Sequence, residues 1–436
     1  MSGLPNERSE SAFVDFKPAL TAQQALVEAN RCLYCSDAPC IKACPTSINI
    51  PEFIRKISTG NLRGSARTIL EANVFGSSCA RVCPVEVLCV GDCVYNHMGV
   101  PPIQIGKLQR YATDTAVADG WEFFAAGADT GKSVGLIGGG PASLAAAHKL
   151  RQFGHQVTIY EARAILGGLN TYGIAPYKLR ADRALDEVEW ILQIGGIDVQ
   201  TGVQIPQQFS WNFLLAKHDA LFIGIGLGPD SVMDLPGGKL GGIHGAAEWI
   251  ERMKLGQVET TGVKRAVVIG GGNTAVDAIR ELRGLGVPHV SLVYRGTESA
   301  MSGYLHEWEE AKMEGAQGIW QTLPVSFQGD GTVRALTCVQ MDDAKRPIVG
   351  TEHELAADLV LVAIGQAKLG DICEDLGVQL DRGRLAVDAT GRTSHPKVFA
   401  GGDCVSGGQE VVNAVAEGRD AAISIHALLT QAGGNP

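Results

Sequence analysis

Eight of the eleven cysteines lie between residues 32 and 93, in two short runs that could bind metal. The first run, CLYCSDAPCIKACP, separates its cysteines by two, four and three residues and ends in Cys-Pro. The second run, CARVCPVEVLCVGDC, separates them by three, five and three residues and has its Cys-Pro near the start. The members are Cys32, Cys35, Cys40 and Cys44, followed by Cys79, Cys83, Cys89 and Cys93.

Several chemistries use clustered thiols. Disulfides are not expected, because the N-terminal sequence MSGLPNERSE lacks the regions of a secretory signal and the cytosol keeps thiols reduced. Structural zinc sites usually take their ligands from paired C-x2–4-C knuckles. Ferredoxin-type motifs are denser and include Cys-Pro, and their thiolates bind the iron of a [4Fe–4S] cluster. The pattern favours iron–sulfur clusters, with zinc and metal-free thiol chemistry as alternatives.

Two glycine-rich segments, about 130 residues apart, have the form of dinucleotide-binding turns. The first is VGLIGGGPAS, in which a tight turn precedes a helix whose N-terminus can receive a pyrophosphate. The third glycine of G-x-G-x-x-G is replaced here by Ser143. An acid at the end of the next strand is placed to hold a ribose hydroxyl. We therefore expect FAD to bind Gly138, Gly140, Pro141, Ala142 and Glu161.

The second segment, AVVIGGGNTAVD, has the form G-x-G-x-x-A and predicts the NAD(P)H site. The residues expected to bind are Gly270, Gly272, Asn273 and Thr274, together with Arg295 at the end of the next strand. An arginine there favours the 2′-phosphate of NADPH, whereas an acid would favour NADH. A single arginine is also a common solvated residue, so the choice between NADH and NADPH stays open.

The elements that must position these residues indicate an α/β protein. Each glycine segment reads as strand, turn, helix and strand, and the apolar segments 220–226 and 359–365 read as later strands of the two sheets. The cysteine runs lie among segments with helical spacing. We predict a helical iron–sulfur domain followed by two Rossmann-like domains, with the NAD(P) domain inserted in the FAD domain. The expected bounds are 1–120 for the clusters, 130–240 for the first FAD part, 241–366 for NAD(P)H and 367–436 for the second FAD part.

Composition excludes several classes of function. The net charge of −10 argues against non-specific binding to nucleic acid or anionic membranes. The apolar runs are shorter than the ~20 residues that span a bilayer, so we expect a cytoplasmic protein. His148 and His155 flank the first nucleotide helix and are expected at the surface. No spacing suggests a hydrolytic triad or a carboxylate pair.

The longer stretches around the cysteines carry a family resemblance. The sequences CLYCSDAPCIKACPTSINIPEFI, CARVCPVEVLCVGDC and PIQIGKLQRYATD resemble dihydropyrimidine dehydrogenase and its PreT-type bacterial flavoprotein subunits. The resemblance continues through both nucleotide segments and covers nearly the whole chain. The glutamate synthase small subunit is a more distant relative. It typically has a three-residue gap where this chain has five between Cys83 and Cys89, and an acidic residue where this chain has Gln109.

The resemblance implies a ligand set in which each cysteine run serves both clusters. Carried over by position, one [4Fe–4S] cluster would bind Cys32, Cys35, Cys40 and Cys93. The other would bind Cys44, Cys83, Cys89 and Gln109, and Cys79 would not be a ligand. Without the resemblance, Gln109 reads as an ordinary helix surface residue. The resemblance also implies flavin contacts at Gly168 in segment 165–179, at Gly402 and Asp403 of the GGD segment, and at Val412.

The implied activity is that of a flavin and iron–sulfur oxidoreductase. Hydride would pass from NAD(P)H to FAD, and single electrons would leave through the two clusters. The expected recipient is an FMN and iron–sulfur catalytic subunit of the PreA type, which would reduce uracil or thymine to the 5,6-dihydropyrimidine within a hetero-oligomer. The alternatives are a glutamate synthase small subunit or another NAD(P)H:ferredoxin-type donor, and a flavoprotein that senses redox state without electron transfer.

Overall fold

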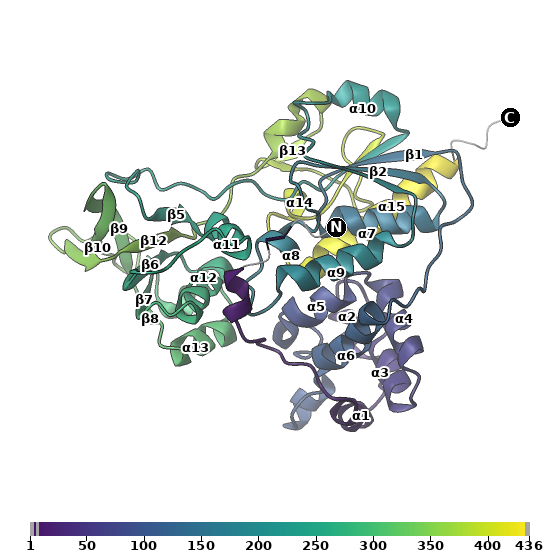
Figure 1. The fold of residues 1–436 in the computed structure, drawn as a ribbon, viewed down its shortest axis with the longest axis horizontal. Helices are drawn as coiled ribbons and strands as arrows, with labels where there is room; N and C mark the ends of the chain where they lie inside the picture. Colours follow the sequence, from purple (N-terminus) through teal and green to yellow (C-terminus); the bar gives the residue numbers. More distant parts are fainter. Residues whose placement is uncertain (1–3, 6–7, 432–436) are drawn as a thin grey trace.

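The computed structural model describes residues 4–5 and 8–431. Figure 1 shows a helical N-terminal part packed beneath a first sheet, and a second sheet that stands to one side of both. Within the described ranges, no helix combines the length and the apolar character needed to cross a membrane.

Short amphipathic helices build the N-terminal part. Thr21 begins α1 with a capping box, because its hydroxyl accepts the Gln24 N–H while the Gln24 side chain accepts the Thr21 N–H. Helix α3 buries Phe53 and Ile54 on the side that faces α4. The elements are η1 (Ser9–Ala12), α1 (Ala22–Asn30), α2 (Pro39–Lys42), α3 (Ile50–Ser58), α4 (Leu62–Ala72), α5 (Gly76–Val82), η2 (Val85–Val87), η3 (Val94–Met98) and α6 (Ile105–Ala118).

The first sheet is parallel, with strand order β15-β4-β1-β2-β3. Ile137 at the end of β1 pairs with Tyr160 of β2 and with Ile223 of β4, so three strand ends meet at one edge. Ligands of open parallel sheets bind at this carboxyl edge. The elements are β1 (Ser133–Ile137), α7 (Pro141–Gln152), β2 (Gln156–Glu161), α8 (Leu169–Tyr172), α9 (Ala181–Leu192), β3 (Ile197–Thr201), α10 (Trp211–Lys217), β4 (Ala220–Ile223), η5 (Gly370–Leu376), β13 (Leu380–Asp381), β14 (Arg384–Leu385), β15 (Val398–Ala400), α14 (Asp403–Ser406) and α15 (Val411–Gln431).

The second sheet repeats the parallel design, with order β5-β12-β6-β7-β8, and an antiparallel three-stranded sheet extends it. Strand β12, between β5 and β6, is buried along its whole length, as expected of a strand covered on both faces. The elements are β5 (Ile243–Gly245), α11 (Ala246–Lys254), β6 (Arg265–Ile269), α12 (Asn273–Gly284), β7 (His289–Val293), η4 (Glu298–Ala300), α13 (Leu305–Met313), β8 (Gln317–Ile319), β9 (Thr322–Asp330), β10 (Thr332–Gln340), β11 (His353–Ala356) and β12 (Leu359–Val362).

The chain enters the first sheet, leaves it for the whole second sheet, and then returns. All strands of the second sheet lie between β4 and β15, and Ala400 of β15 pairs with Ile223 of β4. The expected strands in segments 220–226 and 359–365 are β4 and β12. The predicted fold class, with one dinucleotide domain inserted in the other, is confirmed. The four domain boundaries stay a prediction.

Two histidines differ from expectation. His148 and His155 are buried, not at the surface. The His148 ring stacks on Trp190 of α9 and meets Phe124 edge-on, with ring centroids 6.4 Å and 5.2 Å away. His155 contacts His426 of α15, with 2.9 Å between Nε2 and Nδ1. Helix α7 is covered by α9, by α15 and by the linker after α6, so little of it is left to face solvent.

Candidate cofactor cavity and cysteine pockets

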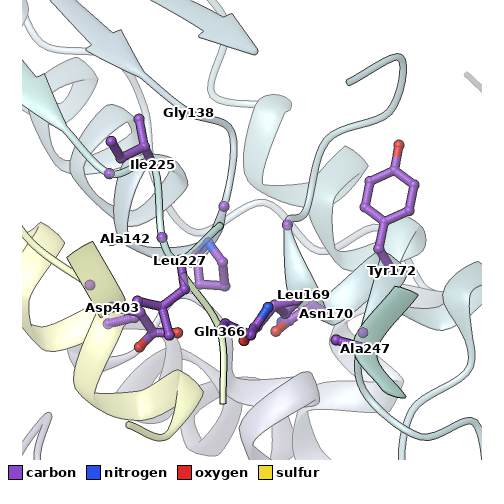
Figure 2. A pocket seen from close by; sticks show the side chains of 18 of the residues that line it. Gly138, Ala142, Leu169, Asn170, Tyr172, Ile225, Leu227, Ala247, Gln366 and Asp403 are labelled. Atoms are coloured by element: carbon purple, nitrogen blue, oxygen red, sulfur yellow. The ribbon is translucent and has the colours of Figure 1, made fainter. Parts of the chain in front are cut away.

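A cavity of about 750 Å³ opens at the carboxyl edge of the first sheet. Figure 2 shows it between the turn at Gly138, the helix start at Asp403 and the segment that carries Leu169 and Asn170. Eight residues expected to contact FAD line this cavity together: Gly138, Gly140, Pro141, Ala142, Glu161, Gly168, Gly402 and Asp403. They come from four separate segments of the chain, which the fold brings to one place.

The glycines of the first turn are required by close backbone packing. Gly138 has φ +95°, and a Cβ on it would lie 2.4 Å from the carbonyl oxygen of Gly224. Gly140 is the N-cap of α7 and has no side-chain cap, so the first backbone N–H groups of this helix face the cavity. A Cβ on Gly168 would lie 2.9 Å from the Cα of Gly140. Two glycine segments thus form a narrow, positively polarised cradle that fits a pyrophosphate.

Glu161 fastens this turn to the end of β2. One carboxylate oxygen accepts the Gly139 N–H at 2.6 Å, and the other accepts the Arg163 N–H at 2.7 Å. The side chain is nearly buried and lines the cavity. A carboxylate oxygen has more than one lone pair, so each oxygen keeps the capacity to accept a further hydrogen bond. The predicted contact with a ribose hydroxyl therefore stays compatible with this geometry.

Charged residues from four segments line the end of the cavity that borders the second sheet. Lys178 Nζ lies 2.8 Å from a carboxylate oxygen of Asp277 and 2.8 Å from one of Glu307. The Tyr304 hydroxyl donates to Glu410 at 2.7 Å. Burial raises the pKa of Glu410 and of Asp403. Asp403 was expected here, whereas the sequence prediction lacked the other members of this group, because no local motif marks them and only the tertiary fold brings them together: Lys178, Asp277, Tyr304, Glu307 and Glu410.

The second glycine turn has the same backbone design. Gly270 has φ +150°, and a Cβ on it would lie 2.3 Å from the carbonyl oxygen of Ala363. Gly272 is the N-cap of α12, and the Asn273 side chain accepts the Tyr304 N–H at 2.9 Å. Thr274 and Arg295 are exposed. Of the five residues expected to bind NAD(P)H, only Asn273 also lines the large cavity.

The first cysteine pocket brings together Cys32, Cys35, Cys40 and Cys93, the four residues that the resemblance assigns to one cluster. All of its wall comes from residues 32 to 105. Burial raises the pKa of the Cys40 thiol to about 12, and the neighbouring thiols of Cys32 and Cys93 add to this. Such thiols stay neutral at pH 7 unless a metal stabilises the thiolate.

The second cysteine pocket brings together Cys44, Cys83, Cys89 and Gln109, and Cys79 also lines it. The buried Gln109 side chain donates its Nε2 to the carbonyl of Gly76 at 2.8 Å, which leaves its Oε1 as the atom able to ligate iron. Burial raises the pKa of Cys89 to about 12. Without the resemblance, Gln109 was expected to lie on the helix surface, and this expectation is wrong because the side chain is buried.

Val412 lies in this second pocket and not in the large cavity, where it was expected. Its neighbour Val411 lines the large cavity instead. Side chains of consecutive helix residues point in directions about 100° apart. The first two residues of α15 therefore line different sites, the large cavity and the second cysteine pocket. The same occurs at the end of α5, where Val82 lines the large cavity and Cys83 lines the second pocket. The two sites therefore share a thin wall.

The donor sets fit the groups that the sequence predicts. Among residues 4–5 and 8–431, no three Cys, His, Asp or Glu side chains are arranged to hold a single metal ion. The two pockets instead place four donors each around an apolar wall. Clustered thiols are the ligands of iron–sulfur clusters. The large cavity has the helix N-terminus, the acid and the length of lining that a dinucleotide needs.

Comparisons with known proteins agree with this arrangement. Residues 8–121 match the family described as dihydropyrimidine dehydrogenase domain II, 4Fe-4S cluster. Residues 132–418 match the pyridine nucleotide-disulphide oxidoreductase family. The chain is 32% identical over 449 residues to the glutamate synthase [NADPH] small chain of Azospirillum brasilense, covering 97% of this chain and 93% of that one. It is 34% identical over 418 residues to the NAD-dependent dihydropyrimidine dehydrogenase subunit PreT of Escherichia coli K12, covering 95% and 97%.

Solved structures share the fold of the two-sheet part. FprA from Mycobacterium tuberculosis in complex with NADPH superposes with a TM-score of 0.56 at 18% identity, covering 69% of this chain and 85% of that one. Thioredoxin reductase from T. acidophilum superposes with a TM-score of 0.55 at 22% identity, covering 68% of this chain and 98% of that one. The chain is thus a member of the pyridine nucleotide-disulphide oxidoreductase family that carries the [4Fe–4S] domain of dihydropyrimidine dehydrogenase, an oxidoreductase that uses FAD, NAD(P)H and iron–sulfur clusters.

Proposed function

We propose that this chain is the electron-input subunit of an NAD(P)H-dependent dihydropyrimidine dehydrogenase. In this role it takes hydride from NAD(P)H onto FAD and passes single electrons through two [4Fe–4S] clusters. The recipient is an FMN-containing, PreA-like partner in a cytoplasmic hetero-oligomer, which reduces uracil or thymine to the 5,6-dihydropyrimidine. The similarity to PreT, whose name describes it as a dehydrogenase subunit, supports the choice of partner and substrate.

The observation that carries the proposal is the wall shared by the flavin cavity and the second cysteine pocket. When bound, FAD accepts hydride from a nicotinamide and can release electrons one at a time to iron–sulfur clusters. Val82 and Val411 form the cavity side of the wall, and Cys83 and Val412 form the pocket side. The apolar side chains of the wall exclude water. The flavin cavity and the cluster pocket, which would hold the electron donor and the electron acceptor, are lined by adjacent residues of the chain. This is the arrangement that a path for single electrons requires.

The remaining residues have assigned roles in the proposal. Backbone N–H groups at the start of α7 bind the FAD pyrophosphate, Glu161 binds the ribose and Asp403 the ribityl chain. Gly270, Gly272, Asn273, Thr274 and Arg295 hold NAD(P)H. Cys32, Cys35, Cys40 and Cys93 ligate the first cluster, and Cys44, Cys83, Cys89 and Gln109 ligate the second. The domain bounds 1–120, 130–240, 241–366 and 367–436 belong to the same proposal.

A glutamate synthase small subunit is the second candidate, because relatives with that name match over nearly the whole chain. Two features favour the first candidate. Five residues separate Cys83 from Cys89, as in the dehydrogenase resemblance. The residue beside these cysteines is Gln109, an amide whose oxygen can ligate iron without adding a charge, and not an acid.

The test is activity after anaerobic co-expression with a PreA-like FMN subunit. Oxidation of NADH and of NADPH is followed with uracil, and separately with 2-oxoglutarate plus glutamine. The expected result is uracil-dependent oxidation by a preparation holding FAD and about eight irons per chain of this protein. No response to pyrimidines from a fully loaded preparation would overturn the dehydrogenase assignment. A response to glutamine and 2-oxoglutarate with a large amidotransferase subunit would establish the second candidate.

A further inference from the structure

Helix α5 carries both sides of the wall between the flavin cavity and the second cysteine pocket, yet it has no cap of its own. Its N-cap residue is Phe75, whose side chain accepts no hydrogen bond. The first backbone N–H groups of a helix need an acceptor when they are buried. Ser77 and Ser78, in the first turn of α5, are buried. The acceptor must therefore come from elsewhere in the chain.

Glu187 of α9 supplies it, from 110 residues further along. Its Oε1 accepts the Ser77 N–H at 2.7 Å, and its Oε2 accepts the Ser78 N–H at 3.0 Å. The Ser78 hydroxyl also donates to Oε2 in a short hydrogen bond. The Glu187 side chain is fully buried. These are the two N–H groups that a normal N-cap side chain would accept, so Glu187 acts as the cap of α5 from another domain.

Both oxygens of the Glu187 carboxyl group act as hydrogen-bond acceptors in this contact. All its partners are donors, and the positive end of the α5 dipole faces it. Burial raises the pKa of Glu187 to about 7, while the Ser78 hydroxyl, the Ser77 and Ser78 N–H groups and the charge of Arg81 act in the opposite direction. Burying an acid is costly unless its hydrogen bonds are complete. A residue that only filled space at this position would not need three hydrogen bonds to its side chain.

Helix α9 is also tied to the flavin side. It follows directly after the segment in which Leu169, Asn170 and Tyr172 line the flavin cavity. The other end of α5 holds Val82 and Cys83, on the two sides of the wall. Glu187 thus connects a helix anchored beside the flavin to the helix that carries an iron ligand.

We propose that Glu187 is a positioning residue that fixes helix α5, and with it Val82 and Cys83, at the distance from the flavin cavity that electron transfer needs. The inference rests on the proposed function, because it concerns the step from FAD to the second cluster. The hydrogen-bond partners of Glu187 are Ser77 and Ser78 of α5, not proposed cluster ligands, so it acts through α5.

The test uses the full chain, loaded with FAD and iron under anaerobic conditions, and compares Glu187→Gln with the wild type. Glutamine keeps the shape but offers one oxygen acceptor in place of two, so one N–H of α5 loses its partner. Rapid mixing with NAD(P)H gives the rate of flavin reduction from absorbance and the rate of cluster reduction from freeze-quench electron paramagnetic resonance. We expect the first rate to be unchanged and the second to fall about tenfold, as small misplacements commonly cost.

Two further readouts separate positioning from general stability. Amide hydrogen exchange in residues 76–82 should speed up in Glu187→Gln, while iron content stays equal to that of the wild type. Glu189→Gln, the same change at an exposed residue of α9, should alter neither rate. Equal cluster-reduction rates in Glu187→Gln and wild type would overturn the inference, as would loss of iron, which would make Glu187 a structural support of the pocket. If NAD(P)H reduces FAD but no cluster in the wild type, the proposed function itself fails.

Discussion

The two glycine turns of this chain have almost the same backbone but different surroundings. Gly138 and Gly270 each approach a backbone carbonyl of a neighbouring strand end so closely that a Cβ would lie within 2.4 Å and 2.3 Å of it. Gly140 and Gly272 are both extended N-caps of a twelve-residue helix. The repeated geometry shows that the turn itself sets only the class of ligand, a dinucleotide with its phosphates at a helix start.

The difference lies at the end of the strand that follows each helix. Glu161 presents a carboxylate to the Gly139 N–H in the first unit. In the second unit the ring of Tyr294 lies against Gly271, where a Cβ would be 2.6 Å from a ring carbon, and its hydroxyl donates to the carbonyl of Ala300. The first turn also opens into the large cavity, whereas the second reaches it only through Asn273 and Asp277. We therefore expect the strand-end residue and the cavity, not the glycines, to distinguish the FAD site from the NAD(P)H site.

The strongest test of this comparison alters both turns in parallel. Gly138→Ala forces a side chain onto a backbone carbonyl at positive φ, which we expect to cost about 3 kcal/mol and to abolish FAD retention. Gly270→Ala should leave FAD in place and abolish flavin reduction by NAD(P)H. FAD content and anaerobic flavin bleaching measure the two effects. Gly202→Ala is the matched control, because Gly202 also has positive φ but open space around it. Loss of FAD in both turn variants would show that the two units are not independent.

A smaller effect is expected at the strand ends. Glu161→Gln leaves one of two backbone N–H groups without a good acceptor, and we expect it to weaken FAD binding by about 1–3 kcal/mol. The measurement is the FAD content after dialysis, together with the thermal unfolding midpoint. Tyr294→Phe, the counterpart in the second unit, removes one hydrogen bond to Ala300 and should leave FAD content unchanged. Equal FAD loss in both variants would contradict the distinction between the two strand ends.

The smallest effect concerns the choice of nicotinamide. Arg295 is exposed beside Tyr294, where a guanidinium could pair with a 2′-phosphate. Arg295→Ala should raise KM for NADPH about tenfold while KM for NADH stays within twofold, since an exposed charge pair contributes on the order of 1 kcal/mol. Steady-state reduction of an artificial acceptor with each nucleotide gives the ratio. A parallel change for both nucleotides would place Arg295 outside the 2′-phosphate site.

Sequence alone predicted the parts of the site whose residues are neighbours in the chain. The glycine turns, Glu161 and the two cysteine runs each belong to a short motif with its own spacing, so the fold class and one part of the cavity lining followed from them. The contacts expected at Gly168, Gly402 and Asp403, and the division of the cysteines between two clusters, came only from the family resemblance. Val412 was expected to contact the flavin but lines the second cysteine pocket, because residues next to each other on α15 face different cavities. His148 and His155 were misjudged because the cover over α7 comes from distant helices. The contacts of Glu187 with Ser77 and of Lys178 with Asp277 join residues that are about 100 or more positions apart in the chain. No local sequence pattern indicates such contacts.

Because β15 and α15 return to the first sheet, the three sites are completed at different times during synthesis. By residue 105 the ribosome has made every residue that lines the first cysteine pocket. The second pocket then still lacks Gly106, Gln109 and Val412, and the last residues of the flavin cavity to be made lie between 402 and 414. N-terminal domains fold first during translation. The wall of the first pocket is therefore complete in sequence while more than three hundred residues remain to be made, whereas the walls of the second pocket and of the flavin cavity are complete only when the start of α15 has been made.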